Sequence, residues 1–188
     1  MRLTGRTAPA SAAAYAAQRK TVTGLASALI ALAGMTLAAP ATAAEHRAAV
    51  PSGDYCNANQ GFYGGGQYTY AEVQVCLRFA SSGNQVIVNA RNNQYYYGGA
   101  WYNASSSYPA RWSATGSVGI GGQSGNYNTG TVTQGSPTGS ASGGSPSSIG
   151  ACGTYSVTLN FHQNGPYWTD GSNDINSGQK SYSISVAC

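Results

Sequence analysis

The amino-acid sequence predicts an all-β protein, folded as a single-domain antiparallel β-sandwich or jelly roll with two disulfides. Apolar and polar residues alternate along several segments, and this period of two is typical of half-buried strands. No segment after residue 44 combines the 3.6-residue period of a helix with helix caps. Four cysteines, an even number, lie in the same part of the chain. Together these patterns favour two stacked antiparallel sheets.

The alternation predicts five strands along the chain. Over 70–79 the odd positions are apolar and the even positions are mostly polar. The turn-forming residues 81–84 (SSGN) follow, and the alternation resumes over 85–92. The later predicted strands cover 111–120, 154–162 and 181–187.

The last two predicted strands are expected to pair antiparallel. When both apolar faces are placed on one side of the pair, Tyr155 lies opposite Val186 and Val157 lies opposite Ile184. This arrangement would also bring the cysteine before the first strand close to the cysteine that ends the chain.

The four cysteines can form two disulfides in three ways. We favour Cys56–Cys76 with Cys152–Cys188, because each pair brackets a hairpin-sized unit. On the chain-entropy model each bridge stabilises the fold by roughly 3–4 kcal/mol. Zinc ligation is not expected, because structural zinc sites draw their cysteines from close pairs in the sequence. Disulfides persist in oxidising compartments, so the cysteines favour an extracellular location.

Residues 1–44 have the pattern of a secretory signal peptide. A basic, acid-free stretch precedes an apolar run from Val22 to Leu37, and small residues follow, with cleavage expected after Ala43 or Ala44. A membrane anchor is the alternative, but the run is short and much of it is Ala, Gly, Thr or Ser. We therefore expect a secreted, extracellular protein.

Removing this leader leaves a chain without net charge. Of nine Lys and Arg residues, four lie in the first twenty positions, so five basic residues face five acidic ones in the remainder. No cluster of Lys and Arg is present there. We therefore expect neither nucleic-acid binding nor attachment to a membrane.

Residues 45–188 are expected to form a single β domain, since their number is close to the usual domain size. Within them, 135–150 (GSPTGSASGGSPSSIG) has the Gly/Ser/Pro composition of a linker. The 38 residues that follow are too few for an independent core. The segment is therefore predicted to be a long mobile loop inside the domain.

The sequence offers few candidate residues for acid–base catalysis. Glu72 is the only Glu of the expected folded part, and we place it on the polar face of its strand, diagonally opposite Arg91, as a surface ion pair. The pair of carboxylates that glycoside hydrolysis needs is missing. A Ser/His/Asp triad would have to use His162 with Asp170 or Asp174, and no motif supports it.

No cofactor and no metal site are expected. Residues 170–174 (DGSND) space oxygen ligands at alternate positions, as calcium loops do. The glycine and the closing glutamate of an EF-hand are absent after them. We favour a plain polar turn, with calcium binding as the alternative.

Aromatic residues remain as the candidate functional groups. The chain has 14 Tyr and 3 Trp, and several gather in two segments outside the predicted strands. Tyr and Trp offer a flat apolar face to a sugar ring and a polar atom to its hydroxyls. Filling and covering the sheets is the alternative role. The candidate binding residues are Tyr95, Tyr96, Tyr97, Trp101, Tyr102, Tyr167 and Trp168.

These observations favour a secreted, non-catalytic protein that binds a polysaccharide or cell-wall surface. Two alternatives stay open: an inhibitor of extracellular proteases or other enzymes, presenting the loop between Cys56 and Cys76, and a small extracellular hydrolase using Glu72 or His162. A coplanar row of exposed aromatic rings would favour sugar binding. A protruding loop braced by a disulfide would favour inhibition.

Overall fold

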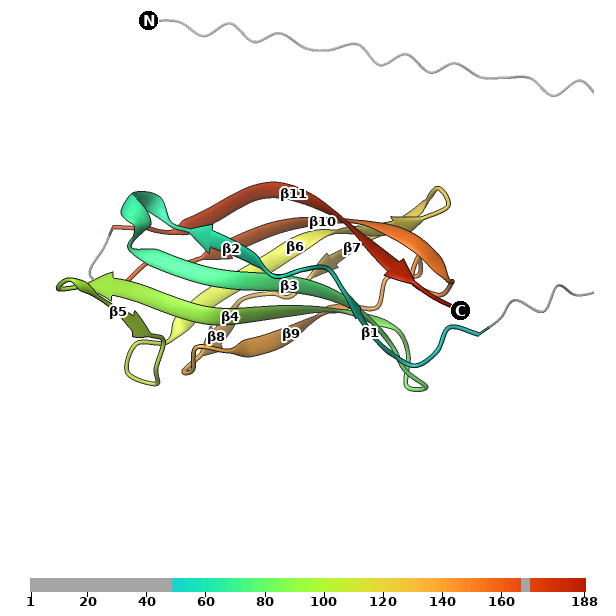
Figure 1. The fold of residues 1–188 in the computed structure, drawn as a ribbon, viewed down its shortest axis with the longest axis horizontal. Coiled ribbons are helices and arrows are strands. Elements are labelled where there is room, and N and C mark those ends of the chain that lie inside the picture. Colours follow the sequence, from blue (N-terminus) through green and yellow to red (C-terminus); the bar gives the residue numbers. More distant parts are fainter. Residues whose placement is uncertain (1–48, 167–169) are drawn as a thin grey trace, which may run out of the picture. The chain divides into compact units, whose positions relative to one another are not determined.

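The structure is a computed structural model that describes residues 49–166 and 170–188. The predicted signal peptide, 1–44, and the candidate residues Tyr167 and Trp168 lie outside the described residues. The described residues belong to one compact unit, Glu45–Cys188. They form two antiparallel sheets, so the predicted all-β fold is confirmed (Figure 1).

The first sheet has six strands in the order β1–β3–β4–β5, with β2 also paired to β3 and β9 also paired to β4. Its outer face carries the candidate site described below. The bounds of its strands are β1 (Gly53–Cys56), β2 (Gln60–Tyr63), β3 (Thr69–Phe79), β4 (Gln85–Tyr97), β5 (Ala100–Asn103) and β9 (Gly139–Gly144).

The second sheet has five strands in the order β11–β10–β6–β7, with β8 also paired to β6. Its bounds are β6 (Ala110–Ile120), β7 (Gln123–Asn128), β8 (Val132–Gln134), β10 (Gly153–Gln163) and β11 (Ile175–Val186). The short 3-10 helix η1 (Gly65–Gln67) connects β2 to β3. In the described part of the chain no helix is long and apolar enough to cross a membrane.

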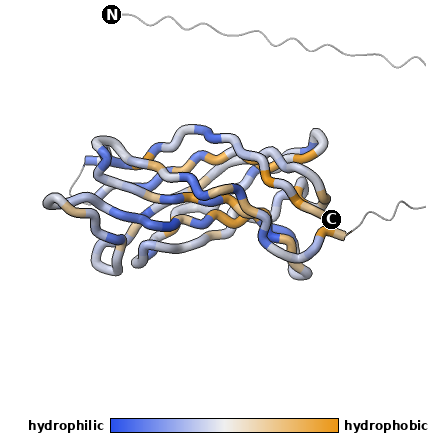
Figure 2. The backbone as a smooth tube through the Cα atoms, in the orientation of Figure 1, coloured by the Kyte–Doolittle hydropathy of each residue, from blue (hydrophilic) through white to orange (hydrophobic). Residues whose placement is uncertain are grey.

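The core lies between the two sheets and follows from the alternation in the sequence. Figure 2 shows how hydrophobic and hydrophilic positions succeed one another along the strands. Phe62 of one sheet stacks on Phe161 of the other, with ring centroids 6.1 Å apart. A fully buried side chain of this size contributes roughly 1.5–3 kcal/mol to folding. The largest fully buried side chains include Trp112, Tyr155, Phe161, Leu77 and Leu159.

The two predicted disulfides are confirmed. Cys56–Cys76 joins β1 to β3 at directly opposed positions. Cys152–Cys188 joins the residue before β10 to the end of the chain. Two disulfides are compatible with an extracellular environment.

The register predicted between the last two strands is wrong by two residues. The strands pair antiparallel on the predicted faces, but Tyr155 lies opposite Ile184 and Val157 lies opposite Tyr182. Alternation fixes the face of a strand and leaves its register free in steps of two residues. The pairing found here leaves Cys188 beyond the end of β11, where it reaches Cys152.

The segment 135–150, predicted to be a mobile loop, contains strand β9. Its residues pair with Val86–Ala90 of β4 and extend the first sheet. Small residues fit here because the space is tight: a Cβ on Gly143 would lie 2.9 Å from the ring of Tyr127. A strand built from Gly, Ser and Ala has no apolar period, which is why composition alone predicts a loop.

Strand β4 continues to Tyr97, five residues past its predicted end. Asn92 adopts a left-handed conformation with φ of 50°. The buried positions are the even-numbered 86, 88 and 90 before it and the odd-numbered 93 and 95 after it, with Ile87 buried as well on the opposite face. Gly98 and Gly99 then form a two-residue turn with positive φ at both positions, as a type I′ hairpin requires. Consecutive tyrosines in this stretch therefore lie on opposite faces of the sheet.

Candidate functional site

Five aromatic side chains gather on the outer face of the first sheet, and we call them the aromatic cluster. They come from four neighbouring strands and from the connection before β3. Because side chains alternate along a strand, Tyr63, Tyr70 and Tyr96 point away from the core next to residues that pack in it, and Trp101 lies opposite Tyr96 on the same face. The members are Tyr63 of β2, Tyr68, Tyr70 of β3, Tyr96 of β4 and Trp101 of β5.

The rings of the aromatic cluster form one contiguous set with Trp101 at its centre. The Trp101 ring centroid lies 5.5 Å from that of Tyr96 and 6.2 Å from those of Tyr63 and Tyr70. Tyr63 and Tyr70 are 4.7 Å apart, and Tyr68 lies 6.0 Å from Tyr96. The spacing is that of aromatic pairs that stabilise one another, so the rings hold their positions together.

The aromatic cluster remains accessible to solvent. Tyr63 is 57% exposed, Tyr68 is 43% exposed and Trp101 is 39% exposed, while Tyr70 and Tyr96 are half-buried. Contiguous exposed aromatic surface is uncommon on a protein that has no partner for it. The set therefore qualifies as a binding surface on physical grounds.

Two glycines leave space for two rings of the aromatic cluster. A Cβ on Gly61 would lie 3.0 Å from the hydroxyl and 3.2 Å from the ring of Tyr70, so Tyr70 rests on the bare backbone of the neighbouring strand. A Cβ on Gly66 would lie 2.9 Å from the ring of Tyr68. A side chain at either glycine would therefore force the neighbouring ring to move.

Polar side chains border the aromatic cluster along the same strands. The Tyr70 hydroxyl donates to Oε1 of Glu72 at 3.0 Å, and Nε2 of Gln94 donates to Oδ1 of Asn103 at 2.9 Å. Burial, assisted by the hydrogen bond to Glu72, raises the pKa of Tyr70 to about 12, so its hydroxyl keeps its proton at neutral pH. Glu72 lies directly opposite Arg91, not diagonally as predicted, and the predicted ion pair between them does not form. The ion pairs among the described residues are Arg78–Asp54 and His162–Asp174. The bordering groups therefore offer both donors and acceptors.

The structure separates the aromatic residues that the sequence grouped together. Of the seven candidates, Tyr96 and Trp101 belong to the aromatic cluster. Tyr95 is only 5% exposed and its hydroxyl donates to the carbonyl oxygen of Pro109 at 3.3 Å. Tyr102, opposite Tyr95, is 55% exposed but lies on the other face of β5 from Trp101. Tyr97 is exposed at the end of β4.

Sequence reasoning missed Tyr63, Tyr68 and Tyr70. Tyr70 occupies a polar-face position of a correctly predicted strand, so the alternation already placed its side chain outside the core. Tyr63 and Tyr68 flank the glycines 64–66, and nothing in that short stretch indicates a strand pairing. Their position became visible only through the pairing of β2 with β3, in which Tyr63 faces Tyr70.

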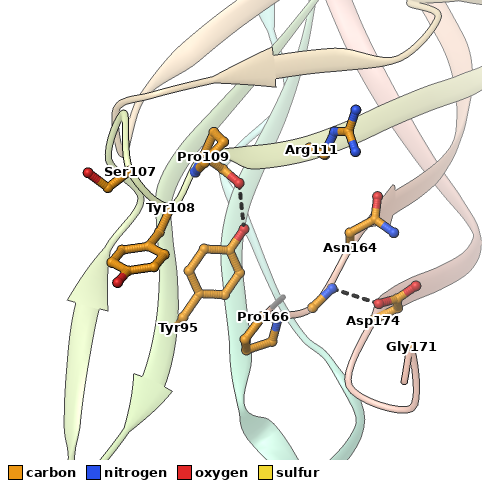
Figure 3. A pocket seen from close by; sticks show the side chains of 10 residues that line it. Tyr95, Ser107, Tyr108, Pro109, Arg111, Asn164, Pro166, Gly171 and Asp174 are labelled. Atoms are coloured by element: carbon orange, nitrogen blue, oxygen red, sulfur yellow. Dashed lines mark hydrogen bonds between the residues drawn. The ribbon is translucent and has the colours of Figure 1, made fainter. Parts of the chain in front are cut away.

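A cavity of about 470 Å³ opens at one end of the sandwich (Figure 3). Its lining includes Tyr95, Tyr108, Arg111, Asn164 and Asp174. Burial, with a smaller effect of the Asp174 charge, raises the pKa of Tyr95 to about 12. Since Tyr95 and Tyr96 lie on opposite faces of β4, this cavity and the aromatic cluster are separate features.

Asp174 is engaged in holding the β10–β11 connection. Its Oδ1 accepts the backbone N–H of Gly165 at 2.6 Å, and its Oδ2 lies 3.2 Å from Nε2 of His162. The His/Asp pair that a hydrolase would use is thus present, but no described hydroxyl is hydrogen-bonded to His162. Among the described residues, the contacts of Asp174 join His162 at the end of β10 to the connection that leads to β11.

The predicted polar turn at 170–174 is held by its own side chains. Oδ1 of Asp170 accepts the backbone N–H of Ser172 at 3.1 Å. Hydrogen bonding by the Ser172 side chain, with a smaller effect of its backbone, lowers the pKa of Asp170. Throughout 49–166 and 170–188, no three His, Cys, Asp or Glu side chains form a group that could hold a metal ion.

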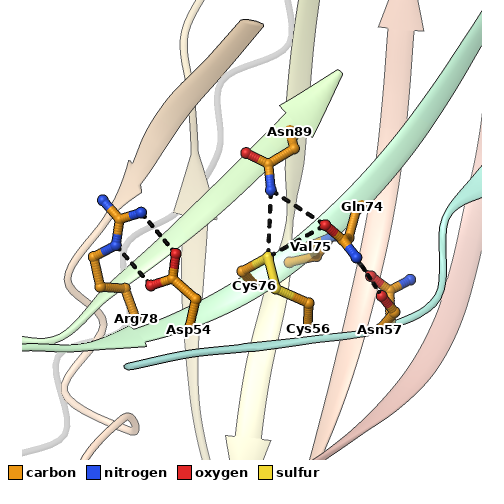
Figure 4. The surroundings of a disulfide bond; sticks show 8 residues. All are labelled: Asp54, Cys56, Asn57, Gln74, Val75, Cys76, Arg78 and Asn89. Carbon is orange, nitrogen blue, oxygen red and sulfur yellow. Dashed lines mark hydrogen bonds and ion pairs between the residues drawn. A yellow bond between two sulfur atoms is a disulfide. The ribbon is translucent and has the colours of Figure 1, made fainter. Parts of the chain in front are cut away.

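The outer face beyond the aromatic cluster is polar, and its groups bind one another (Figure 4). Arg78 forms two hydrogen bonds of 2.7 Å with Asp54. Near Cys56–Cys76, Nδ2 of Asn89 lies 3.4 Å from Oε1 of Gln74.

The chain between Cys56 and Cys76 does not project as a separate loop. It contains β2, paired with β3, and the connection that includes η1. At Gly64 and Gly65 the backbone approaches the carbonyl oxygens of Asn173 and Ser172 so closely that a Cβ would overlap them. The segment is anchored to the rest of the domain at β2 and at Gly64 and Gly65, while residues 65–68 are exposed.

Comparison with known proteins gives no further guide: no family model, no curated protein and no solved structure matches this chain.

Proposed function

We propose that this chain is an extracellular, non-catalytic protein that binds a polysaccharide against its aromatic cluster. One observation carries the proposal. Five Tyr and Trp rings stay together and accessible on an outer sheet face, beside side chains that can bond to hydroxyl groups.

A carbohydrate can interact both with the aromatic rings of this surface and with the polar groups that border them. The C–H-rich face of a sugar ring packs on the flat face of Tyr or Trp, and its equatorial hydroxyls seek donors and acceptors at the rim. Gln94 and Asn103 supply amide groups there, and Glu72 supplies a carboxylate whose Oε2 has no hydrogen bond to a described residue. The border of the site thus supplies the polar atoms that give a sugar its orientation.

The charge of the expected mature chain supports an uncharged ligand. Five basic residues balance five acidic ones once the leader is set aside. Beside the aromatic cluster, the positive charge of Arg91 lies directly opposite the negative charge of Glu72. Neither an anionic nor a cationic ligand would be attracted over a distance by such a surface.

The acidic side chains near the aromatic cluster also support binding without catalysis. Hydrolysis of a glycosidic bond requires two carboxyl groups flanking the scissile bond. Among the described residues, Glu72 is the acidic side chain that borders the aromatic cluster, and it is hydrogen-bonded to Tyr70. Asp54, farther along the same face, is paired with Arg78.

Substitution of the central ring tests the proposal. Trp101→Ala should weaken retention on insoluble polysaccharide by tenfold or more, because a central Trp commonly carries about 2 kcal/mol or more of a binding energy. Tyr102→Ala is the matched control, since Tyr102 is the next residue of β5 and lies on its other face. Thermal unfolding of both variants checks that the fold is intact.

Equal retention of Trp101→Ala and wild type, with both folded, would place the binding surface elsewhere. A loss in Tyr102→Ala as large as that in Trp101→Ala would contradict the assignment to the outer face.

A further inference from the structure

The rings of the aromatic cluster are not coplanar, so they do not form the coplanar row that was expected of a sugar-binding surface. Tyr63 and Tyr70 meet at 40°, and Tyr68 and Tyr96 meet at 57°. Trp101 meets Tyr63, Tyr96 and Tyr70 at 60°, 63° and 69°. Each of the Trp101 contacts is edge-to-face, so the edge of one ring covers part of the next.

Strand twist supplies only part of this tilt, and the side-chain rotamers supply the rest, because the ring angles exceed the rotation between neighbouring strands. Four members come from four different strands, and neighbouring strands of a sheet are rotated relative to one another by about 20–25°. Tyr68 comes from outside the strands and rests over Gly66. The accessible ring faces consequently point in different directions, and no single plane can lie against all of them.

We infer that the aromatic cluster binds one twisted, uncharged glycan chain and does not bind the flat face of a crystalline polysaccharide. The inference rests on the proposed function. A crystalline face presents its sugar rings in one plane and would touch only one or two of these aromatic faces. A single chain can rotate about each glycosidic bond, so successive sugar rings can follow the differently tilted aromatic faces.

The contacts among the rings suggest the path of such a chain. Tyr68, Tyr96, Trp101 and Tyr63 form a series with successive centroid distances of 6.0, 5.5 and 6.2 Å. These steps are of the same order as the distance between neighbouring sugar rings in a β-linked glycan. Gln94 and Asn103 lie next to the middle of the series, two positions along β4 and β5 from the pair Tyr96–Trp101 and on the same face of the sheet.

The test compares soluble, amorphous and crystalline forms of the same polysaccharides. The soluble probes are the hexasaccharides of cellulose, chitin, xylan and β-1,3-glucan, measured by titration calorimetry. Pull-down on swollen and on microcrystalline cellulose and chitin supplies the solid forms. We expect binding of at least one soluble hexasaccharide, with an affinity that high NaCl leaves unchanged, and retention on crystalline solids no greater than that of Trp101→Ala.

The possible failures are distinguishable. Retention on a crystalline solid without binding of any soluble chain would overturn this inference and leave the proposed function standing. If an anionic probe, the hexasaccharide of polygalacturonate, bound more tightly than every neutral one and lost that affinity in high NaCl, the uncharged character of the ligand would be overturned. Absence of binding to every probe would overturn the proposed function and the inference together.

Substitutions at the ends of the series provide a second measurement that does not depend on the central Trp. Tyr63→Ala and Tyr68→Ala remove exposed rings and should fold normally. Each should lower the affinity for the hexasaccharide by about three- to tenfold and leave that for the disaccharide unchanged. If neither variant changes hexasaccharide affinity while Trp101→Ala abolishes it, the chain does not follow this series and the inference fails.

Discussion

Tyr127 places a buried hydroxyl beside the second sheet, where it donates to the carbonyl oxygen of Thr158 at 2.7 Å. Burial raises the pKa of Tyr127, so the proton stays on the oxygen. Gly116 makes this arrangement possible. A Cβ there would overlap the carbonyl oxygen of Thr158 and would lie 2.8 Å from the Tyr127 hydroxyl. The absence of a side chain at Gly116 thus leaves room for the hydrogen bond from Tyr127 to Thr158.

Gly116→Ala should lower the free energy of unfolding by about 1–3 kcal/mol, because the added methyl group has to displace backbone in a packed interior. Gly150→Ala is the control, since a Cβ at Gly150 would meet nothing within 4 Å. Urea denaturation of both variants measures the difference. Equal stability of the two would mean that the sheet relaxes around the methyl group without loss.

At the scale of elements, predictability depended on whether a strand has one apolar face. β3 and β10 alternate over their whole length and were predicted closely. β9 carries Gly, Ser and Ala against a sheet that leaves no room for more, so its sequence has no period to detect. In β4 the inward-facing positions change from even to odd numbers at Asn92. A strand predicted from the even positions alone therefore ends there.

Whether a strand shows a clear alternation also determined how much of the candidate site could be predicted from the sequence. Tyr96 and Trp101 were predicted from composition, but the hairpin that turns them outward and Tyr95 inward was not. Tyr63 joins the site through a pairing of strands that no local pattern indicates. A surface assembled from several strands depends on register, and register is the property that alternation determines least.

For the whole molecule, tyrosine ionisation should determine stability at high pH. The pKa of Tyr95 and of Tyr70 is raised to about 12, chiefly by burial, against an ordinary value of 10.0. The folded state then holds protons that the unfolded state releases. Stability is fully present below pH about 10 and is lost as the pH rises toward 12.

Urea denaturation at increasing pH, read together with tyrosine absorbance, measures this effect. The free energy of unfolding should fall between pH about 10 and 12, with part of the tyrosine absorbance change appearing only on unfolding. Tyr95→Phe should make the fall less steep. Complete titration of all tyrosines near pH 10 in the folded protein would contradict the burial that the structure assigns to them.

The central claim, that the molecule acts by holding a glycan on the aromatic cluster, is tested most directly by NMR mapping of a bound soluble hexasaccharide. We predict chemical-shift changes at the Trp101 indole N–H and at backbone amides around Tyr63, Tyr70 and Tyr96, with the buried Trp112 indole unaffected. Shifts confined instead to Tyr108, Arg111 and Asp174 would place the ligand in the cavity at the end of the sandwich and contradict the account.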